Sequence, residues 1–283
     1  MRKRLREKDP RGGNPTCPDL KTNKRHPQCS MTPTTVPPTL QQRLSERTRP
    51  QGPVVMYQRW EHLLFLHWRY DAAIVQSMLP PGLTVDTWNG SAWVGLVPLF
   101  MRDVRPRFVP AVSMLSDFFE LNLRTYVFDA TGRPGLYFFS LDCDQPVVVE
   151  TARRLLNLRY EHAAIEAAAG VDGWVNFETQ RNATVLRSHF RYRAFGTATQ
   201  AAEDSIEFFL LERYRLFASD SGGERLHSIR VCHAPYRVRS AEVTNWGDAV
   251  LRLAGFAPPD REPDHVCATG PQDVEVFAPE AVE

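Results

Sequence analysis

The sequence contains almost no lysine: it has four among 283 residues, all within the first 24 positions. They are Lys3, Lys8, Lys21 and Lys24. A lysine amine can lose its proton and attack a carbonyl group, whereas an arginine guanidinium stays protonated in proteins. No side chain after residue 24 can therefore form a Schiff base.

Long apolar runs are missing as well. Stretches such as Val94–Met101 and Phe208–Leu211 end at charged residues well before the roughly 18 residues that a membrane-spanning helix needs. Residues 1–9 are rich in Arg, Lys and Glu and include no apolar segment, so the sequence predicts no secretory signal of the usual kind. We expect a cytoplasmic protein with no membrane partner.

The sequence also lacks the motifs of metal and cofactor sites. Its five cysteines are widely spaced and form no Cys-x-x-Cys pair, and neither nucleotide-binding nor dinucleotide-binding motifs occur. His62 and His67 do not have the His-Glu-x-x-His spacing of a zinc hydrolase. We therefore predict no metal site and no cofactor.

Positive charge is concentrated at the start of the chain. Residues 1–50 hold 12 Lys or Arg against 4 Asp or Glu, a net charge of +8, which leaves −7 for the rest of a chain whose total is +1. Nucleic-acid binding depends on basic surfaces, so nucleic acid is not a predicted partner. Residues 1–52 also hold many prolines and almost no aromatic residue, which predicts a disordered basic tail. The end of lysine use after this tail suggests an over-extended gene start, with translation beginning at Met31 or Met56.

From Tyr57 onward the sequence has the alternating aromatic and β-branched pattern that is typical of strands. Asn89-Gly90 predicts a tight hairpin turn. Two antiparallel pairs are predicted, Glu120–Phe128 with Leu136–Cys143 and Phe208–Ala218 with Leu226–His233. Helices are predicted at Asp71–Met78, Val147–Leu156, Glu161–Ala169 and Ser240–Leu253. The predicted fold class is mainly β with a few flanking helices.

The predicted strand Phe118–Phe128 is the most informative segment. It alternates with period two, and one of its faces carries Glu120, Asn122, Arg124 and Tyr126. Four different hydrogen-bonding groups on one face suggest a binding or catalytic site. Glu120 and Arg124 lie about 13 Å apart at the backbone, so they could bracket a ligand. The alternative is that both pair with neighbouring strands in a buried network, because buried charges need partners.

Other predicted strands add polar residues. Glu212 shares a face with Tyr214 in an apolar run, and it needs a cation such as Arg124 or Arg181. A structural ion pair is the favoured interpretation of Glu212.

Ser140 shares a face with Asp142 and Asp144, and it lacks the Gly-x-Ser-x-Gly elbow of serine hydrolases. His67, Trp68 and Trp93 are candidates for a pocket wall, although tryptophans in such runs more often belong to the core.

Five segments together resemble the YqjF-like family, an uncharacterised bacterial family: Phe65–Trp68, Trp93–Pro98, Glu120–Val127, Phe139–Asp142 and Phe209–Tyr214. The resemblance covers nearly everything after Met56 and predicts one domain over residues 53–283. YqjF-like proteins are in turn similar to the acetoacetate decarboxylase-like superfamily, which implies a closed, cone-shaped β-barrel with a central pocket.

The superfamily resemblance implies a catalytic lysine after a helical segment that corresponds here to Ala152–Tyr160. This chain offers Arg159 near that place, and a guanidinium cannot act as the nucleophilic amine. Two hypotheses remain. The protein binds a small organic acid or aromatic compound in the barrel pocket, or it is a cofactor-free enzyme for proton transfer, hydration or cyclisation. In the second hypothesis Glu120 is the acid or base and Arg124 holds an anion. We favour binding, because no residue replaces the lost lysine clearly.

Overall fold

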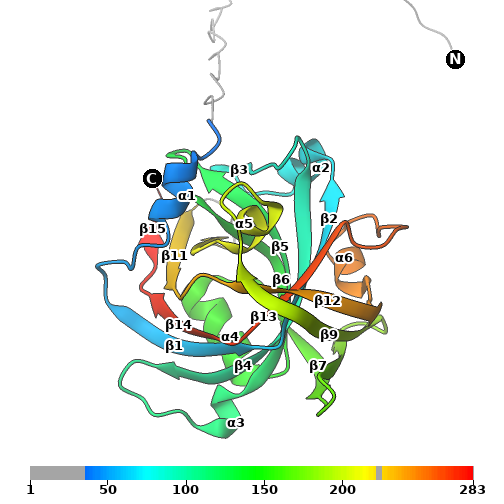
Figure 1. Cartoon of the computed structure of the whole chain (residues 1–283). Helices are drawn as coiled ribbons and strands as arrows, with labels where there is room; N and C mark the ends of the chain where they lie inside the picture. The colour runs from blue at the N-terminus through cyan, green and yellow to red at the C-terminus, as the bar shows by residue number, and fades with distance from the viewer. Residues whose placement is uncertain (1–35, 221–224, 283) are drawn as a thin grey trace, which may run out of the picture. The chain divides into compact units, whose positions relative to one another are not determined.

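Strands dominate the fold, as the alternating pattern predicts. The structure is a computed structural model, and it describes residues 36–220 and 225–282. Within these ranges six helices accompany fifteen strands (Figure 1). The helices are α1 (Leu40–Ser45), α2 (Ala72–Ser77), α3 (Ser113–Ser116), α4 (Pro146–Leu156), α5 (Ile206–Leu211) and α6 (Ala249–Leu253). The first eight strands are β1 (Val54–Glu61), β2 (Leu63–Tyr70), β3 (Leu83–Val85), β4 (Ala92–Pro106), β5 (Phe118–Asp129), β6 (Pro134–Cys143), β7 (Tyr160–Ala169) and β8 (Trp174–Arg181). The others are β9 (Arg187–Gln200), β10 (Arg215–Ser219), β11 (Leu226–Cys232), β12 (Arg237–Asn245), β13 (His265–Thr269), β14 (Gln272–Phe277) and β15 (Glu280–Ala281).

All these strands belong to one sheet. Its pairing order is β1-β14-β11-β10-β6-β7-β8-β9-β12-β13-β2-β4-β5-β3, and β15 pairs with β11. Further pairings of β1 with β4 and of β5 with β6 connect distant parts of this path. The mainly-β prediction is confirmed, and the closed, cone-shaped barrel stays a prediction.

The predicted hairpins are largely confirmed. β5 and β6 pair in antiparallel fashion from Glu120 opposite Cys143 to Phe128 opposite Pro134. β10 and β11 pair from Arg215 to Ser219. Asn89 and Gly90 have φ angles of 50° and 77°, which is the left-handed conformation that a two-residue hairpin turn requires.

Two of the four predicted helices are wrong in whole or in part. Glu161–Ala169 lies in strand β7, because its pairing between β6 and β8 outweighs the helix propensity of its alanines. Ser240–Leu253 divides into the end of β12 and the short helix α6. The helices at Asp71–Met78 and Val147–Leu156 are confirmed as α2 and α4.

The predicted strand from Phe208 begins as a helix. Ser205 caps α5 by accepting a hydrogen bond from the Phe208 N–H, and the helix continues to Leu211 with its apolar residues buried. A short apolar run is ambiguous between a buried strand and a buried helix. The sequence pattern alone could not decide between them.

The predicted tail extends too far into the chain. Residues 1–35 lie outside the described residues, but α1 forms within the predicted tail and is fixed by a capping box between Thr39 and Gln42. Figure 1 shows α1 beside α5, and the Arg43 guanidinium lies 5.2 Å from the ring centre of Phe209. Arg43 also forms an ion pair of 2.6 Å with Asp86. The prediction of a disordered tail up to residue 52 is therefore wrong for residues 40–45.

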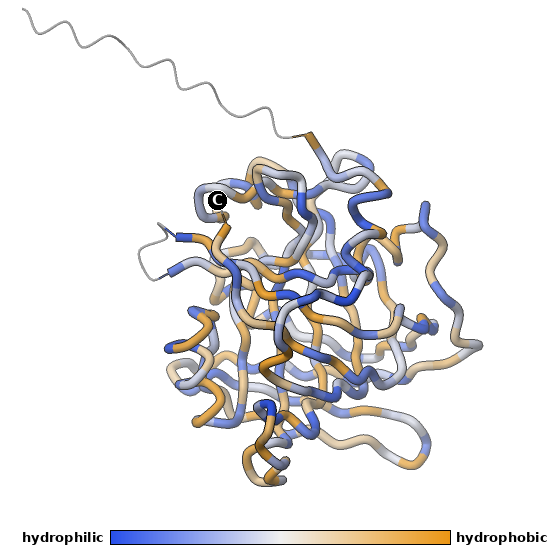
Figure 2. Tube along the Cα trace, turned by 90° about the vertical axis from the view of Figure 1, so that its left-hand side faces the viewer, coloured by the Kyte–Doolittle hydropathy of each residue, from blue (hydrophilic) through white to orange (hydrophobic). Residues whose placement is uncertain are grey.

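The two faces of β5 contribute to different hydrophobic clusters, as the alternation predicts. Leu121, Leu123 and Val127 pack in the cluster that includes residues of α6. Phe118 and Tyr126 pack in the cluster that includes residues of α5. In Figure 2 hydrophobic and hydrophilic segments alternate along the strands in the same way. No helix in the described part of the chain is both long and apolar enough to cross a bilayer.

Candidate functional site

The polar residues of β5 are buried. Glu120, Asn122, Arg124 and Tyr126 have relative exposures between 0% and 6%. We call the face of the sheet formed by these four residues the β5 polar face. Because water does not cover these groups, each must be satisfied by other protein groups or by a bound molecule.

A row of paired residues crosses the sheet at Arg124. Arg124 lies opposite Gly95 on β4, Gly95 lies opposite His67 on β2, and His67 lies opposite His265 on β13. A Cβ atom on Gly95 would lie 2.7 Å from Cδ2 of His67. The absence of a side chain at Gly95 therefore lets the imidazole lie across β4 and reach the hydroxyl of Tyr126, 2.7 Å from Nε2.

Arg124 is a buried cation with few partners. Its Nη2 makes two long hydrogen bonds of 3.4 Å, to the Tyr126 hydroxyl and to the carbonyl of Leu210. Its Nε is buried and has no hydrogen-bond partner. No carboxylate of residues 36–220 or 225–282 forms an ion pair with it, although the guanidinium lies over the ring of Phe65 at 5.0 Å. A guanidinium has five N–H donors, so most of the binding capacity of Arg124 is unused.

Glu120 lies on the same face, and no cation of residues 36–220 or 225–282 forms an ion pair with it. The Tyr160 hydroxyl donates to its Oε2 at 2.8 Å. Burial raises the pKa of Glu120 from 4.5 to about 7, while hydrogen bonds from Tyr160 and Asn122 lower it and the charge of Asp142 raises it further. A carboxyl group with this pKa can give or take a proton near neutral pH.

Two other buried polar atoms on this face have no hydrogen-bond partner in the part of the chain that the structure describes. They are Nε1 of Trp93 and Oδ1 of Asn122. An indole N–H donor and an amide acceptor without partners cost free energy unless a bound molecule or water satisfies them. The predicted residues His67, Trp93, Asn122 and Tyr126 are thus brought together with Glu120 and Arg124.

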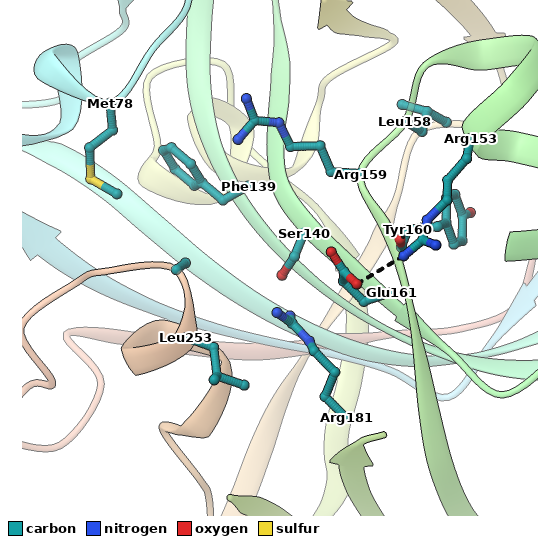
Figure 3. A pocket seen from close by; sticks show the side chains of 11 residues that line it. Met78, Phe139, Ser140, Arg153, Leu158, Arg159, Tyr160, Glu161, Arg181 and Leu253 are labelled. Atoms are coloured by element: carbon teal, nitrogen blue, oxygen red, sulfur yellow. Dashed lines mark hydrogen bonds and ion pairs between the residues drawn. The ribbon is translucent and has the colours of Figure 1, made fainter. Parts of the chain in front are cut away.

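A cleft of about 490 Å³ lies elsewhere on the sheet. Its walls include Met78, Phe139 and Leu253 on the apolar side and Ser140, Arg159, Glu161 and Arg181 on the polar side. In Figure 3 the side chains of Ser140, Glu161 and Arg181 point toward one another, and Arg159 extends above Phe139. The ring of Tyr160 points away from this centre. Three arginines therefore line the cleft: Arg153, Arg159 and Arg181.

The polar groups of the cleft differ in how well they are paired. Arg181 binds Asp142 at 2.6 Å, and Arg153 binds Glu161 at 2.9 Å. Arg159 is exposed and forms no ion pair within the described residues, and its guanidinium lies 5.5 Å from the Tyr137 ring. The Ser140 hydroxyl is 4% exposed and has no hydrogen-bond partner.

The cleft and the β5 polar face lie on opposite faces of the sheet. Ser140 pairs with Leu123, whose side chain belongs to the apolar face of β5, whereas Phe138 pairs with Arg124. The residue between them, Phe139, has no partner because the register shifts there by one residue. This β-bulge turns Ser140 away from Arg124 and into the cleft.

The structure does not bring the other predicted residues to either place. Trp68 lies on the face opposite to His67, where its ring packs 5.0 Å from that of Trp246. Glu212 accepts hydrogen bonds from Tyr214 and from Arg47, which is its ion-pair partner at 3.1 Å. The structural ion pair of Glu212 is confirmed, and the prediction of Arg124 or Arg181 as its cation is wrong.

Sequence reasoning missed several residues that complete these sites. Tyr160, and not Arg159, reaches Glu120, since Tyr160 opens β7 with its side chain on the face of Glu120. The alternation of Tyr160, His162 and Ala164 could have indicated this strand, but the alanines that follow favoured a helix. Nothing in the sequence marks Gly95 or His265 as neighbours of His67, because strand pairing joins them.

Metal ligands are not clustered in the part of the chain that the structure describes. No group of three or more His, Cys, Asp or Glu side chains there could hold an ion. The guanidinium and hydroxyl groups of the cleft suit an organic anion better than a metal.

The fold of this chain is similar to those of several solved acetoacetate decarboxylase-like proteins. The acetoacetate decarboxylase from Legionella pneumophila has a TM-score of 0.57 at 12% identity, over 84% of this chain and 91% of that chain. An acetoacetate decarboxylase-like enzyme from Sphingomonas wittichii RW1 has a TM-score of 0.56 at 14% identity, with 82% and 94% covered. The enduracididine biosynthesis enzyme MppR complexed with pyruvate has a TM-score of 0.56 at 14% identity, with 85% and 94% covered. At these identities the likeness shows the fold alone.

Sequence comparison gives the family. The model of DUF2071, described as an uncharacterized conserved protein, matches residues 57–272. The uncharacterized protein YqjF of Bacillus subtilis (strain 168) is 33% identical over 214 residues, which cover 76% of this chain and 87% of YqjF. The chain therefore belongs to the DUF2071 family, and the predicted YqjF-like resemblance is confirmed.

Proposed function

We propose that the protein binds a small organic acid in the cleft beside β6. Its carboxylate accepts hydrogen bonds from Arg159 and Ser140, and its organic part packs against Phe139, Met78 and Leu253. The single observation that carries this proposal is that a cation without an ion-pair partner among the described residues and a buried, unpartnered hydroxyl line the same hollow. A charged hydrogen bond from Arg159 can anchor a carboxylate.

The fold neighbours support a carboxylate ligand without deciding its identity. MppR, one of the structures that share the fold, is described in complex with pyruvate. Schiff-base chemistry is not part of this proposal, since residues 25–283 contain no lysine. Arg159 can only hold the anion, because its guanidinium does not deprotonate.

Calorimetric titration with acetate, pyruvate and benzoate tests the proposal. We expect at least one of the three to bind, with benzoate favoured if the apolar wall supplies most of the contact area. Arg159→Gln should weaken that binding by about tenfold or more, because a hydrogen bond to a charged group contributes roughly 1.5–3 kcal/mol. Ser140→Ala should weaken it by a smaller factor.

Arg154→Gln is the matched control. Arg154 lies on α4, is 78% exposed and pairs only with Glu150, and it does not line the cleft. Its replacement removes the same charge from the same neighbourhood. Equal losses of affinity in Arg154→Gln and Arg159→Gln would mean that the loss comes from removing a positive charge at a distance. That result would contradict a direct contact between Arg159 and the ligand. Absence of binding by all three acids would refute the proposal.

A second candidate function is proton transfer at the β5 polar face. The raised pKa of Glu120 favours it, together with the unused donors of Arg124. In this candidate Glu120 takes a proton from a carbon next to a carbonyl group, and Arg124 holds the resulting enolate oxygen.

Deuterium exchange into pyruvate tests this second candidate. The protein should accelerate the loss of the pyruvate methyl proton signal in deuterium oxide, and Glu120→Gln should abolish the acceleration. Exchange that is equally fast with and without the protein would rule out this candidate for keto acids. The cleft variant Arg159→Gln should leave the exchange rate unchanged, because it alters the opposite face of the sheet.

A further inference from the structure

A continuous series of buried polar groups connects the β5 polar face to the protein surface. Arg124 Nη2 lies 3.4 Å from the Tyr126 hydroxyl, which lies 2.7 Å from Nε2 of His67. Nδ1 of His67 lies 3.2 Å from Nδ1 of His265. Nε2 of His265 lies 3.5 Å from Oε1 of Glu207, whose side chain is 36% exposed. The series begins at a buried cation and ends at a carboxylate in contact with water.

The two ends fix the direction of every hydrogen bond in this series. Arg124 can only donate, so the Tyr126 oxygen accepts from it. The direction of the other bonds is set from the Glu207 end, and with both imidazoles neutral it makes the Tyr126 hydroxyl donate to Nε2 of His67. His67 must then carry its proton on Nδ1 and donate it to Nδ1 of His265. His265 in turn carries its proton on Nε2 and donates it to Glu207, whose ionised carboxylate can only accept. One arrangement of protons satisfies all these contacts.

The burial of the two histidines agrees with this arrangement, which requires both rings to be neutral. Burial lowers the pKa of His67 well below 6.5, and the nearby charges of His265 and Arg124 act in the same direction. Burial also lowers the pKa of His265, although Glu207 opposes this effect. Both imidazoles are therefore uncharged at neutral pH, with one proton each.

We propose that Tyr126, His67 and His265 form a proton relay that carries a proton from the β5 polar face to Glu207. The O–H bond of Tyr126 breaks as an N–H bond forms at Nε2 of His67. The Nδ1 proton of His67 passes to Nδ1 of His265, and the Nε2 proton of His265 passes to Glu207. One proton leaves the buried face, Glu207 becomes neutral, and the negative charge stays on the Tyr126 oxygen beside Arg124.

The local structure is built so that this path can exist. Gly95 leaves the space that the His67 ring occupies between Tyr126 and His265. Strand pairing places His265 directly opposite His67, and Glu207 lies in the first turn of α5. The relay is independent of the cleft, since it lies on the other face of the sheet.

Measurement of the histidine tautomers by long-range ¹H–¹⁵N NMR is the first test. The whole chain at pH 7 should show His67 with its proton on Nδ1 and His265 with its proton on Nε2. Free imidazole side chains favour the Nε2 proton, so the His67 result is specific to the proposed direction. A proton on Nε2 of His67, or a doubly protonated ring at either residue, would overturn the proposal.

Proton exchange with water is the second test, and it separates transport from structure. Glu207→Gln keeps an acceptor for His265 but cannot take up a proton. We expect it to slow exchange of the buried His67 Nδ1 proton with solvent at least tenfold. Glu203→Gln, an exposed replacement a few residues before α5, should leave the rate within twofold of the unchanged protein.

Equal exchange rates in the two variants would show that the groups are only hydrogen-bonded, and the relay would be rejected. Urea unfolding of each variant should show the same free energy as the unchanged protein, so that slower exchange is not caused by rarer global opening. The tautomer measurement uses the unsubstituted chain and decides the proton direction even if a variant fails to fold.

Discussion

Replacement of Glu120 should change how the stability of the protein depends on pH. Burial raises the pKa of Glu120 from 4.5 to about 7 in the folded protein. Between these two values the unfolded chain has released this proton while the folded chain still holds it. Because the folded state then binds more protons, the free energy of unfolding falls as the pH rises from 4.5 to 7. The contribution of the neutral Glu120 carboxyl to the free energy of unfolding is fully present below pH 4.5 and is lost above pH 7.

The size of this effect follows from the change in pKa. Each unit corresponds to about 1.36 kcal/mol, so the change from 4.5 to about 7 corresponds to about 3 kcal/mol. Glu120→Gln cannot ionise, and its amide oxygen can still accept the hydrogen bond from Tyr160. Relative to the unchanged protein, Glu120→Gln should therefore gain about 3 kcal/mol of unfolding free energy between pH 4.5 and pH 8.

Urea unfolding of both proteins at half-unit steps of pH measures this gain directly. The difference between the two curves removes the contributions of all other titrating groups. Glu178→Gln is the control, because it makes the same change of side chain at an exposed strand residue. A difference for Glu120→Gln that is constant across this range would refute the reasoning from burial, and with it the role of Glu120 as an acid or base.

Two further predictions concern packing. Gly95→Ala should destabilise the protein by about 1–3 kcal/mol in urea unfolding, since its Cβ would lie 2.7 Å from the buried His67 ring and overpack the site; an unchanged midpoint would contradict the close contact. A chain that begins at Met56 should have a lower Tm than one that begins at Met31, because only the longer chain keeps α1 and the ion pairs of Arg43 and Arg47. Equal Tm values would mean that α1 contributes nothing to stability.

The sequence predicted the faces of β5 correctly because alternation is a local property of a strand. Glu120, Asn122, Arg124 and Tyr126 share one buried face, as the period of two requires. The alternation could not predict which residues of other strands lie next to this face. Those depend on pairing between β4, β5 and β2, which are distant in the chain, and pairing is decided by the register of the whole sheet.

The cleft could not be predicted for a different reason. In a regular strand Phe138 and Ser140 would share one face, so the sequence pattern places Ser140 with the residues opposite Arg124. The bulge at Phe139 places Ser140 on the opposite face from Phe138, and no residue in the segment predicts a bulge. Ser140 and Arg181 are candidate ligand-binding residues in the sequence, but the structure places them in a separate hollow, away from Glu120.

Tyr126 of the β5 polar face and the half-buried Tyr160 of β7 have opposite electrostatic surroundings. Burial and the neighbouring Glu120 carboxyl raise the pKa of Tyr160 well above 10, so Tyr160 keeps its proton and serves as a donor to Glu120. Burial also raises the pKa of Tyr126, but Arg124 lowers it through its charge and its hydrogen bond. A phenolate is therefore less costly at Tyr126 than at Tyr160. In the proton transfer that we propose for this face, Glu120 acts at one end and Tyr126, beside Arg124, acts at the other.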